Sequence, residues 1–102
     1  MDIFTDGPRL MLAGEFDVRS TFQVRQAVYQ HLQTHDGDVV IDMTDVTSID
    51  LTALKVLAVA TRYAERTGHH LTLRGCGPAV RRMLHKSHLI RLVDVERTPA
   101  TA

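Results

Sequence analysis

The segment Ser48-Ile49-Asp50-Leu51-Thr52-Ala53-Leu54 joins a stretch with the pattern of a buried strand to one with the pattern of a helix. The strand pattern is Val39-Val40-Ile41-Asp42-Met43, which is almost continuously apolar, and the helical pattern extends from Leu51 to Thr67. Asp50 is a typical N-cap residue, so Thr52 falls in the first helical turn, where backbone N–H groups lack partners within the helix. A hydroxyl there can serve the helix end or carry a phosphate whose charge the helix N-terminus stabilises.

Strand and helix patterns alternate along the rest of the 102 residues. The predicted strands are 3–4, 10–13, 39–43, 69–73 and a short one within 89–95, and the predicted helices are 20–34, 51–67 and 78–86. The order β-β-α-β-α-β-α-β predicts an α/β fold with a mixed β-sheet and helices packed against it. We expect a single domain over residues 1–96 and a polar C-terminal tail at 97–102.

The composition argues against several classes of partner. Twelve basic and twelve acidic residues cancel, whereas binding to nucleic acid needs an excess of clustered Lys and Arg. No apolar run approaches the roughly 20 residues of a membrane span, and the N-terminus lacks the pattern of a signal peptide. The single cysteine, Cys76, cannot form an internal disulfide and is expected to be a small packing residue. We therefore expect a cytoplasmic protein without nucleic-acid or membrane partners.

No pattern typical of an enzyme active site or a cofactor site is present, so neither catalysis nor a cofactor is predicted. His31 and His35 are spaced i, i+4, but zinc sites usually take three or four ligands. We predict no metal site and expect His31 at the edge of the core. Asp42, Asp45 and Asp50 leave one alternative, a Mg²⁺ site as in a response-regulator receiver. The chain is short for that fold and lacks its lysine.

The predicted helix that begins at Leu51 has two apolar faces. The face that fits the sheet consists of Leu54, Leu57, Ala58, Thr61 and Ala64. The opposite face, called here the outer stripe, consists of Thr52, Val56, Val59 and Tyr63. Lys55, Arg62 and Arg66 flank the outer stripe on one side. An apolar stripe with a polar rim is typical of a docking surface, and the alternative is that both faces are buried within the same domain.

Over nearly all of its length, the chain resembles the STAS domain in its anti-sigma factor antagonist form. The segments that carry the resemblance are Gly14–Asp17 ahead of the first helix, Val40–Met43 and Val46–Asp50 as a strand and its following loop, Leu51–Leu54 in place of Ser-Ser/Thr-Gly-Leu, Gly77–Leu84 as the third helix, and Leu89-Ile90 before the last strand. The resemblance implies a small STAS-like domain.

Members of this family act as switches in bacterial partner-switching systems. The unphosphorylated form binds an anti-sigma factor, which is often also a serine/threonine protein kinase. This kinase phosphorylates the antagonist at the head of the second helix, which ends the interaction. A phosphatase then removes the phosphate. The resemblance implies that Thr52 is the phosphoacceptor. The oligomeric state stays open between a monomer and a weak homodimer, because the outer stripe can also mediate self-association. Together with the outer stripe, it predicts a partner-binding set of Asp17, Ser48, Asp50, Leu51, Ala53, Val56, Val59 and Tyr63.

The sequence departs from the family pattern beside Thr52. Leu51 stands where a small polar residue is usual, and Ala53 stands where glycine is usual. Both residues are bulkier at the place where a kinase must approach the hydroxyl. The alternative function is therefore a constitutive STAS interaction module that docks without modification, with Thr52 supplying only a structural hydroxyl.

Overall fold

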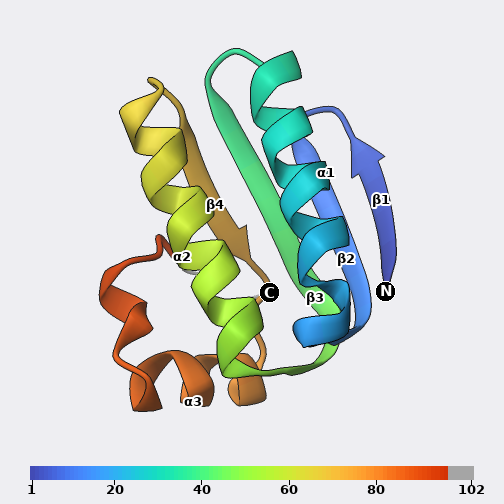
Figure 1. Cartoon of the computed structure of the whole chain (residues 1–102), viewed down its shortest axis with the longest axis vertical. Coiled ribbons are helices and arrows are strands. Elements are labelled where there is room, and N and C mark those ends of the chain that lie inside the picture. Colours follow the sequence, from blue (N-terminus) through green and yellow to red (C-terminus); the bar gives the residue numbers. More distant parts are fainter. Residues whose placement is uncertain (97–102) are drawn as a thin grey trace, which may run out of the picture.

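The computed structural model describes residues 1–96, and the expected tail at 97–102 lies outside this part of the chain. The helices and strands, shown in Figure 1, are β1 (Asp2–Asp6), β2 (Arg9–Phe16), the 3₁₀ helix η1 (Val18–Ser20), α1 (Thr21–Thr34), β3 (Asp38–Ile49), α2 (Leu51–Arg66), β4 (His70–Arg74), α3 (Pro78–Lys86) and the 3₁₀ helix η2 (Leu89–Arg91).

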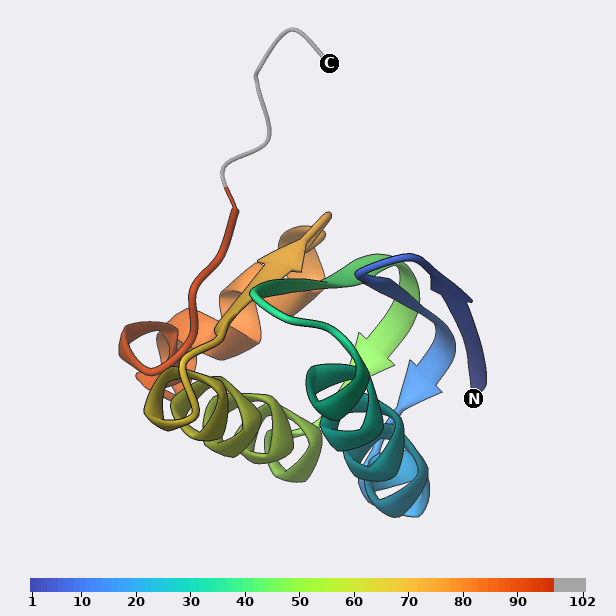
Figure 2. The ribbon, with the colours of Figure 1, turned by 90° about the horizontal axis from the view of Figure 1, so that it is seen from above.

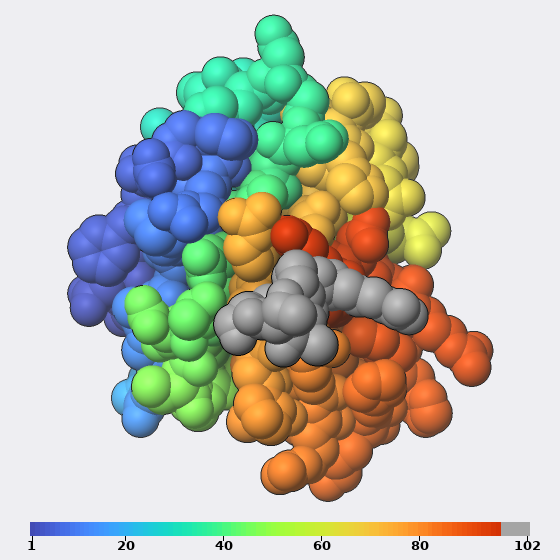
Figure 3. All heavy atoms as spheres, turned by 180° about the vertical axis from the view of Figure 1, so that it is seen from behind, coloured from blue at the N-terminus to red at the C-terminus, as the bar shows by residue number. Residues whose placement is uncertain are grey.

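The four strands form one sheet in the order β1-β2-β3-β4. The β1–β2 pair is a hairpin and antiparallel, whereas β2–β3 and β3–β4 are parallel. Helices α1 and α2 lie side by side against one face of this sheet (Figures 1 and 2). On the opposite face, atoms of the strands reach the molecular surface (Figure 3). The predicted mixed sheet with helices packed against it is confirmed.

The core lies between the sheet and helices α1 and α2, and α3 adds Val80 and Leu84 to it. It contains alternate residues of the strands, such as Leu10 and Leu12 of β2 and Ile41 of β3, and all three are fully buried or nearly so. The α2 residues predicted to face the sheet, namely Leu54, Leu57, Ala58, Thr61 and Ala64, are all buried, as predicted. Cys76 and His31 are also buried, in agreement with their expected places in and at the edge of the core.

The strands depart from their predicted ranges. Strands β1 and β2 are longer than predicted, and β2 continues to Phe16. The strand expected within residues 89–95 is reduced to the single bridge residue Val95, which pairs in parallel with Leu73 at the outer edge of β4. Before it, His88 adopts a left-handed conformation (φ 62°) and the chain turns into η2. Leu89, Ile90 and Val93 then pack against the core instead of forming a strand. Strand β3 is longer than predicted and continues to Ile49.

Within residues 1–96, no helix is both long enough and apolar enough to cross a membrane.

Candidate functional site

The head of α2 is fastened by Asp50, which follows β3 directly. Its Oδ1 accepts a hydrogen bond from the backbone N–H of Ala53 at 2.8 Å, which is the geometry of an N-cap. Its Oδ2 accepts a second hydrogen bond, from the backbone N–H of Val18 at 3.0 Å, and this bond ties η1 to α2. Because Asp50 caps the helix, the hydroxyl of Thr52 is not needed for that purpose. Thr52 is exposed in the first turn.

The outer stripe is open to solvent along most of its length. Val59 is 55% exposed and Val56 is half-buried, so water reaches both valines. The alternative that both faces of α2 are sealed within the domain is therefore wrong. At the far end of the stripe, Tyr63 is half-buried because it lies against Tyr29 of α1, with ring centroids 4.8 Å apart and planes tilted by 33°. The C-terminal end of the outer stripe therefore contacts α1 through Tyr63.

A groove of about 290 Å³ runs between α1 and α2 and is called here the α1–α2 groove. It is lined by Arg25 and Tyr29 of α1 and by Thr52, Lys55, Val56 and Val59 of α2. The residue predicted to accept a phosphate therefore shares a concave surface with two valines of the outer stripe and with two cations.

The other predicted partner-binding residues fall into three situations. Ser48 and Leu51 are exposed beside the head of α2, and Leu51 exposes 43% of its surface. Asp17 caps η1, and its carboxylate holds the guanidinium of Arg19 at 2.6 Å. This hydrogen bond lowers the pKa of Asp17 below its ordinary value. Ala53 is fully buried in the core, so the expectation that its side chain lies in the docking surface is wrong.

The sequence pattern does not identify two exposed apolar residues that lie beside this surface. Val18 of η1 is 61% exposed and Phe22 of α1 is 70% exposed. Phe22 stands two positions before Val24, off the inward face of its helix, and an aromatic residue on an outward face was the available signal. The contribution of Val18 could not be seen, because it depends on the hydrogen bond that brings η1 to α2.

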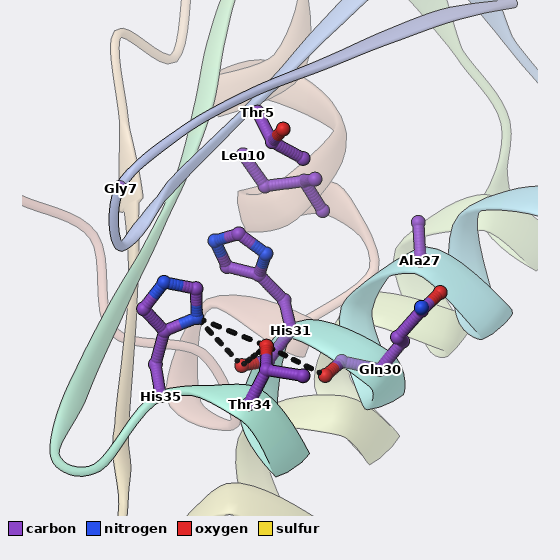
Figure 4. Close-up of a pocket in the computed structure, with 8 residues that line it drawn as sticks. All are labelled: Thr5, Gly7, Leu10, Ala27, Gln30, His31, Thr34 and His35. Atoms are coloured by element: carbon purple, nitrogen blue, oxygen red, sulfur yellow. Dashed lines mark hydrogen bonds between the residues drawn. The ribbon is translucent and has the colours of Figure 1, made fainter.

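A second cavity, of about 410 Å³, lies between the β1–β2 turn and the last turns of α1 (Figure 4). His31 points into this region and lies against His35, with ring centroids 4.2 Å apart. Its Nε2 is buried and has no hydrogen-bond partner within residues 1–96. Burial lowers the pKa of His31, and the neighbouring His35 adds to this effect, so the ring loses its proton more readily than a free histidine does. The cavity shares no lining residue with the α1–α2 groove.

The three aspartates of the receiver-like alternative are not brought together. Within residues 1–96, no group of three or more His, Cys, Asp or Glu side chains is placed to hold a metal ion. Asp42 accepts hydrogen bonds from the N–H and the hydroxyl of Thr44 at 2.9 and 2.6 Å. Burial alone would raise the pKa of Asp42, but these bonds and nearby arginines hold it below its ordinary value. Asp50 is engaged at the head of α2.

The sequence profile of the family described as "Mlab, STAS domain" matches residues 2–94. The chain belongs to this STAS domain family. The match covers every strand of the sheet, all three α-helices and both walls of the α1–α2 groove.

The fold of this STAS domain is similar to those of several solved proteins. TM1081 of Thermotoga maritima, a candidate anti-sigma factor antagonist, is 19% identical with a TM-score of 0.77, covering 98% of this chain and 88% of that protein. An anti-sigma factor antagonist of Mycobacterium paratuberculosis is 24% identical with a TM-score of 0.73, covering 94% and 83%. The anti-sigma factor antagonist SpoIIAA in its unphosphorylated form is 15% identical with a TM-score of 0.72, covering 94% and 87%. SpoIIAA of Bacillus is also known in a phosphorylated form, to which the TM-score is 0.66.

Proposed function

We propose that this STAS domain, over residues 1–96, is an anti-sigma factor antagonist that releases its partner when Thr52 is phosphorylated. The observation that carries the proposal is the position of Thr52, exposed in the first turn of α2 and lining the same groove as Val56 and Val59. Support comes from the similarity in fold to SpoIIAA, which is known in unphosphorylated and phosphorylated forms. Control of sigma factors takes place in the cytoplasm, where we place the protein as a monomer or weak homodimer.

In the proposed reaction, the partner is both an anti-sigma factor and a serine/threonine kinase. A bond forms between Thr52 Oγ1 and the γ-phosphorus of ATP, the bond to ADP breaks, and a base of the kinase takes the hydroxyl proton. The phosphate adds about −1.5 to −2 charges to the docking surface. Taking this charge out of water in the interface costs several kcal/mol, and the cations that line the same groove, Arg25 and Lys55, offset only part of this cost, so the complex dissociates. A phosphatase restores the hydroxyl by hydrolysis.

The phosphorylation is tested by incubating the protein with candidate anti-sigma kinases and ATP and measuring its intact mass. We expect one added phosphate on the unmodified chain and none on Thr52→Ala. A phosphate that persists on Thr52→Ala would move the site elsewhere, with the exposed Ser48 as the next position to examine.

The docking surface is tested separately with Val56→Asp and Val59→Asp. Both variants are expected to lose partner binding while their circular dichroism and urea midpoint stay close to those of the unmodified chain, because water already reaches both valines. Unfolding of either variant would assign the outer stripe to the core and remove the basis of the proposal.

The second candidate function is a constitutive STAS interaction module. The exposed Leu51 beside Thr52 favours it, because an apolar side chain stands where a kinase must approach the hydroxyl. The two functions differ in Thr52→Glu: the switch requires a large loss of partner affinity, whereas the constitutive module keeps nearly all of it.

A further inference from the structure

The α1–α2 groove has an apolar floor and a cationic rim. Val56, Val59 and the ring of Tyr29 supply the floor, whereas Arg25 and Lys55 stand at the rim and are both exposed. An apolar floor accepts an apolar side chain, and the two cations determine which charges can stand beside it.

Arg25 lies at the groove over the ring of Tyr29. Its Cζ lies 5.5 Å from the centroid of the Tyr29 ring, and that ring packs against Tyr63 of α2. A guanidinium above an aromatic face keeps its in-plane N–H donors available, and their fork matches the two oxygens of a carboxylate. Arg25 is thus placed to bind an anion from another molecule.

Helices α1 and α2 contain more basic than acidic residues. Helix α1 contains no Asp or Glu, and the single carboxylate of α2 is Glu65 near its C-terminal end. Within residues 1–96, neither Arg25 nor Lys55 takes part in an ion pair, and the same holds for Arg62 and Arg66 further along α2. Arg25 and Lys55 are therefore free to pair with carboxylates of a molecule that occupies the groove.

We propose that the α1–α2 groove binds an acidic amphipathic segment of the anti-sigma partner, with an apolar side chain on Val56 and Val59 and flanking carboxylates on Arg25 and Lys55. The proposal rests on the proposed function for the kind of partner and adds the chemistry by which that partner is recognised. It extends the docking surface from α2 onto α1, so Arg25 becomes a specificity-determining residue.

A second copy of this chain is the competing occupant. The exposed face of edge strand β1 presents Phe4, which is 55% exposed, between Asp2 and Asp6. A head-to-tail contact of this face with the groove would likewise place an apolar side chain on the two valines and carboxylates near the two cations. It would bury only one large apolar side chain, which is far less than a stable interface requires.

The groove is tested with short synthetic amphipathic helical peptides and ¹⁵N-labelled protein. The probe carries one leucine with glutamates one turn to each side, and the matched peptides carry lysine in place of glutamate or serine in place of leucine. We expect the Glu/Leu peptide to shift the amide resonances of Arg25, Lys55, Val56 and Val59, and both matched peptides to bind about tenfold more weakly. Equal binding of the Lys/Leu peptide, or shifts that map away from the groove, would overturn the proposal.

Charge reversal gives the sharper test. The double variant Arg25→Glu/Lys55→Glu is expected to exchange the preference, binding the Lys/Leu peptide about tenfold better than the Glu/Leu peptide. Arg82→Glu/Lys86→Glu on the exposed face of α3 changes the net charge equally and is expected to leave the preference unaltered.

The outcome for the partner itself separates this proposal from the proposed function. An anti-sigma factor that binds the protein but tolerates Arg25→Glu/Lys55→Glu within about twofold would overturn the groove chemistry and leave the function intact. Association between copies, measured by sedimentation and removed by either Phe4→Ser or Val59→Asp, would assign the groove to a second copy and overturn the proposal as well.

Discussion

Asp50 accepts, through Oδ2, a hydrogen bond from the backbone N–H of Val18 at 3.0 Å, and this bond spans 32 positions of sequence. The same carboxylate caps α2 through Oδ1, so one side chain sets both the start of α2 and the position of η1 beside it. Substitution of Asp50 therefore tests whether the docking surface is held in place by this carboxylate.

Asp50→Ala is expected to lower the free energy of unfolding by about 1–2 kcal/mol, because the helix loses its cap and the N–H of Val18 loses a charged acceptor. Asp50→Asn keeps one acceptor oxygen and should cost less. Urea denaturation measures both values, with Asp45→Ala on the exposed part of β3 as the control. A loss for Asp50→Ala no larger than that of the control would show that the carboxylate does not hold the two elements together.

Thr52→Glu is expected to stabilise the fold by about 0.3–1 kcal/mol, although the proposed function requires that it weaken partner binding. A carboxylate in the first turn of α2 is favoured by the helix dipole, and Lys55 stands one turn further on. In a double-mutant cycle with Lys55→Ala, we expect a coupling of about 0.3–0.5 kcal/mol that high salt reduces. Thr52→Gln has a similar shape without the charge and serves as the control. Zero coupling at low salt would show that an anion on this residue does not reach Lys55.

His31 predicts a pH dependence of stability. Burial, with a contribution from His35, lowers its pKa below the ordinary value of 6.5, so the folded chain takes up this proton less readily than the unfolded chain. The stability that depends on the neutral ring is complete above pH 6.5 and is lost as the pH falls from there through the lowered pKa.

His31→Leu should flatten this decline, as measured by urea unfolding at several pH values between about 5 and 7.5. At neutral pH the variant should be as stable as the unmodified chain or slightly more stable, because it removes a buried Nε2 that has no partner within residues 1–96. His85→Gln, at an exposed position of α3, is expected to keep the original slope. An unchanged slope in His31→Leu would assign the pH dependence to other groups.

Gly75 connects β4 to α3 with φ of +72°, and a Cβ at this position would collide with the hydroxyl of Thr44 on β3. Gly75→Ala is expected to lower the free energy of unfolding by about 2–4 kcal/mol, through the left-handed backbone and the collision together. Gly68→Ala has a similar φ of +83° with no atom within 4 Å of the added Cβ, so it should cost only about 1–2 kcal/mol. Thermal or urea unfolding compares the two variants, and Thr44→Ala should recover part of the loss in Gly75→Ala but none in Gly68→Ala.

The elements predicted best from the sequence are those set by neighbours in the chain. Helix α3 begins at Pro78 and ends at Lys86 as predicted, because proline is favoured in the first turn of a helix. Strand β3 was predicted too short, because Thr44, Asp45 and Thr47 lack the apolar pattern of a buried strand. Backbone pairing with β2, such as Ala13 with Asp45, extends the strand regardless of these side chains.

Some residues of the candidate site could likewise be predicted from their neighbours in the chain, and others could not. Thr52 and the two valines could be placed on the second helix from the sequence, because a helical period fixes which side chains share a face. Asp50 could be placed at its start, because aspartate is favoured as an N-cap. Arg25, Tyr29 and Phe22 could not be assigned to the site, because their relation to α2 depends on how two helices pack on one sheet. Ala53, predicted to bind the partner, is instead buried in the core, because the contact of the first turn of α2 with the core depends on how the layers pack.

The sequence by itself determined the order of the elements, the capped head of the second helix and the two apolar faces of that helix. Each of these follows from hydrogen bonds and periodicities between residues close together in the chain. Only the tertiary structure decided that the outer stripe forms a groove with a cationic rim, because α1 and α2 are brought side by side through the sheet that both cover (Figure 2). A surface made by two helices depends on their relative placement, and no local pattern specifies it.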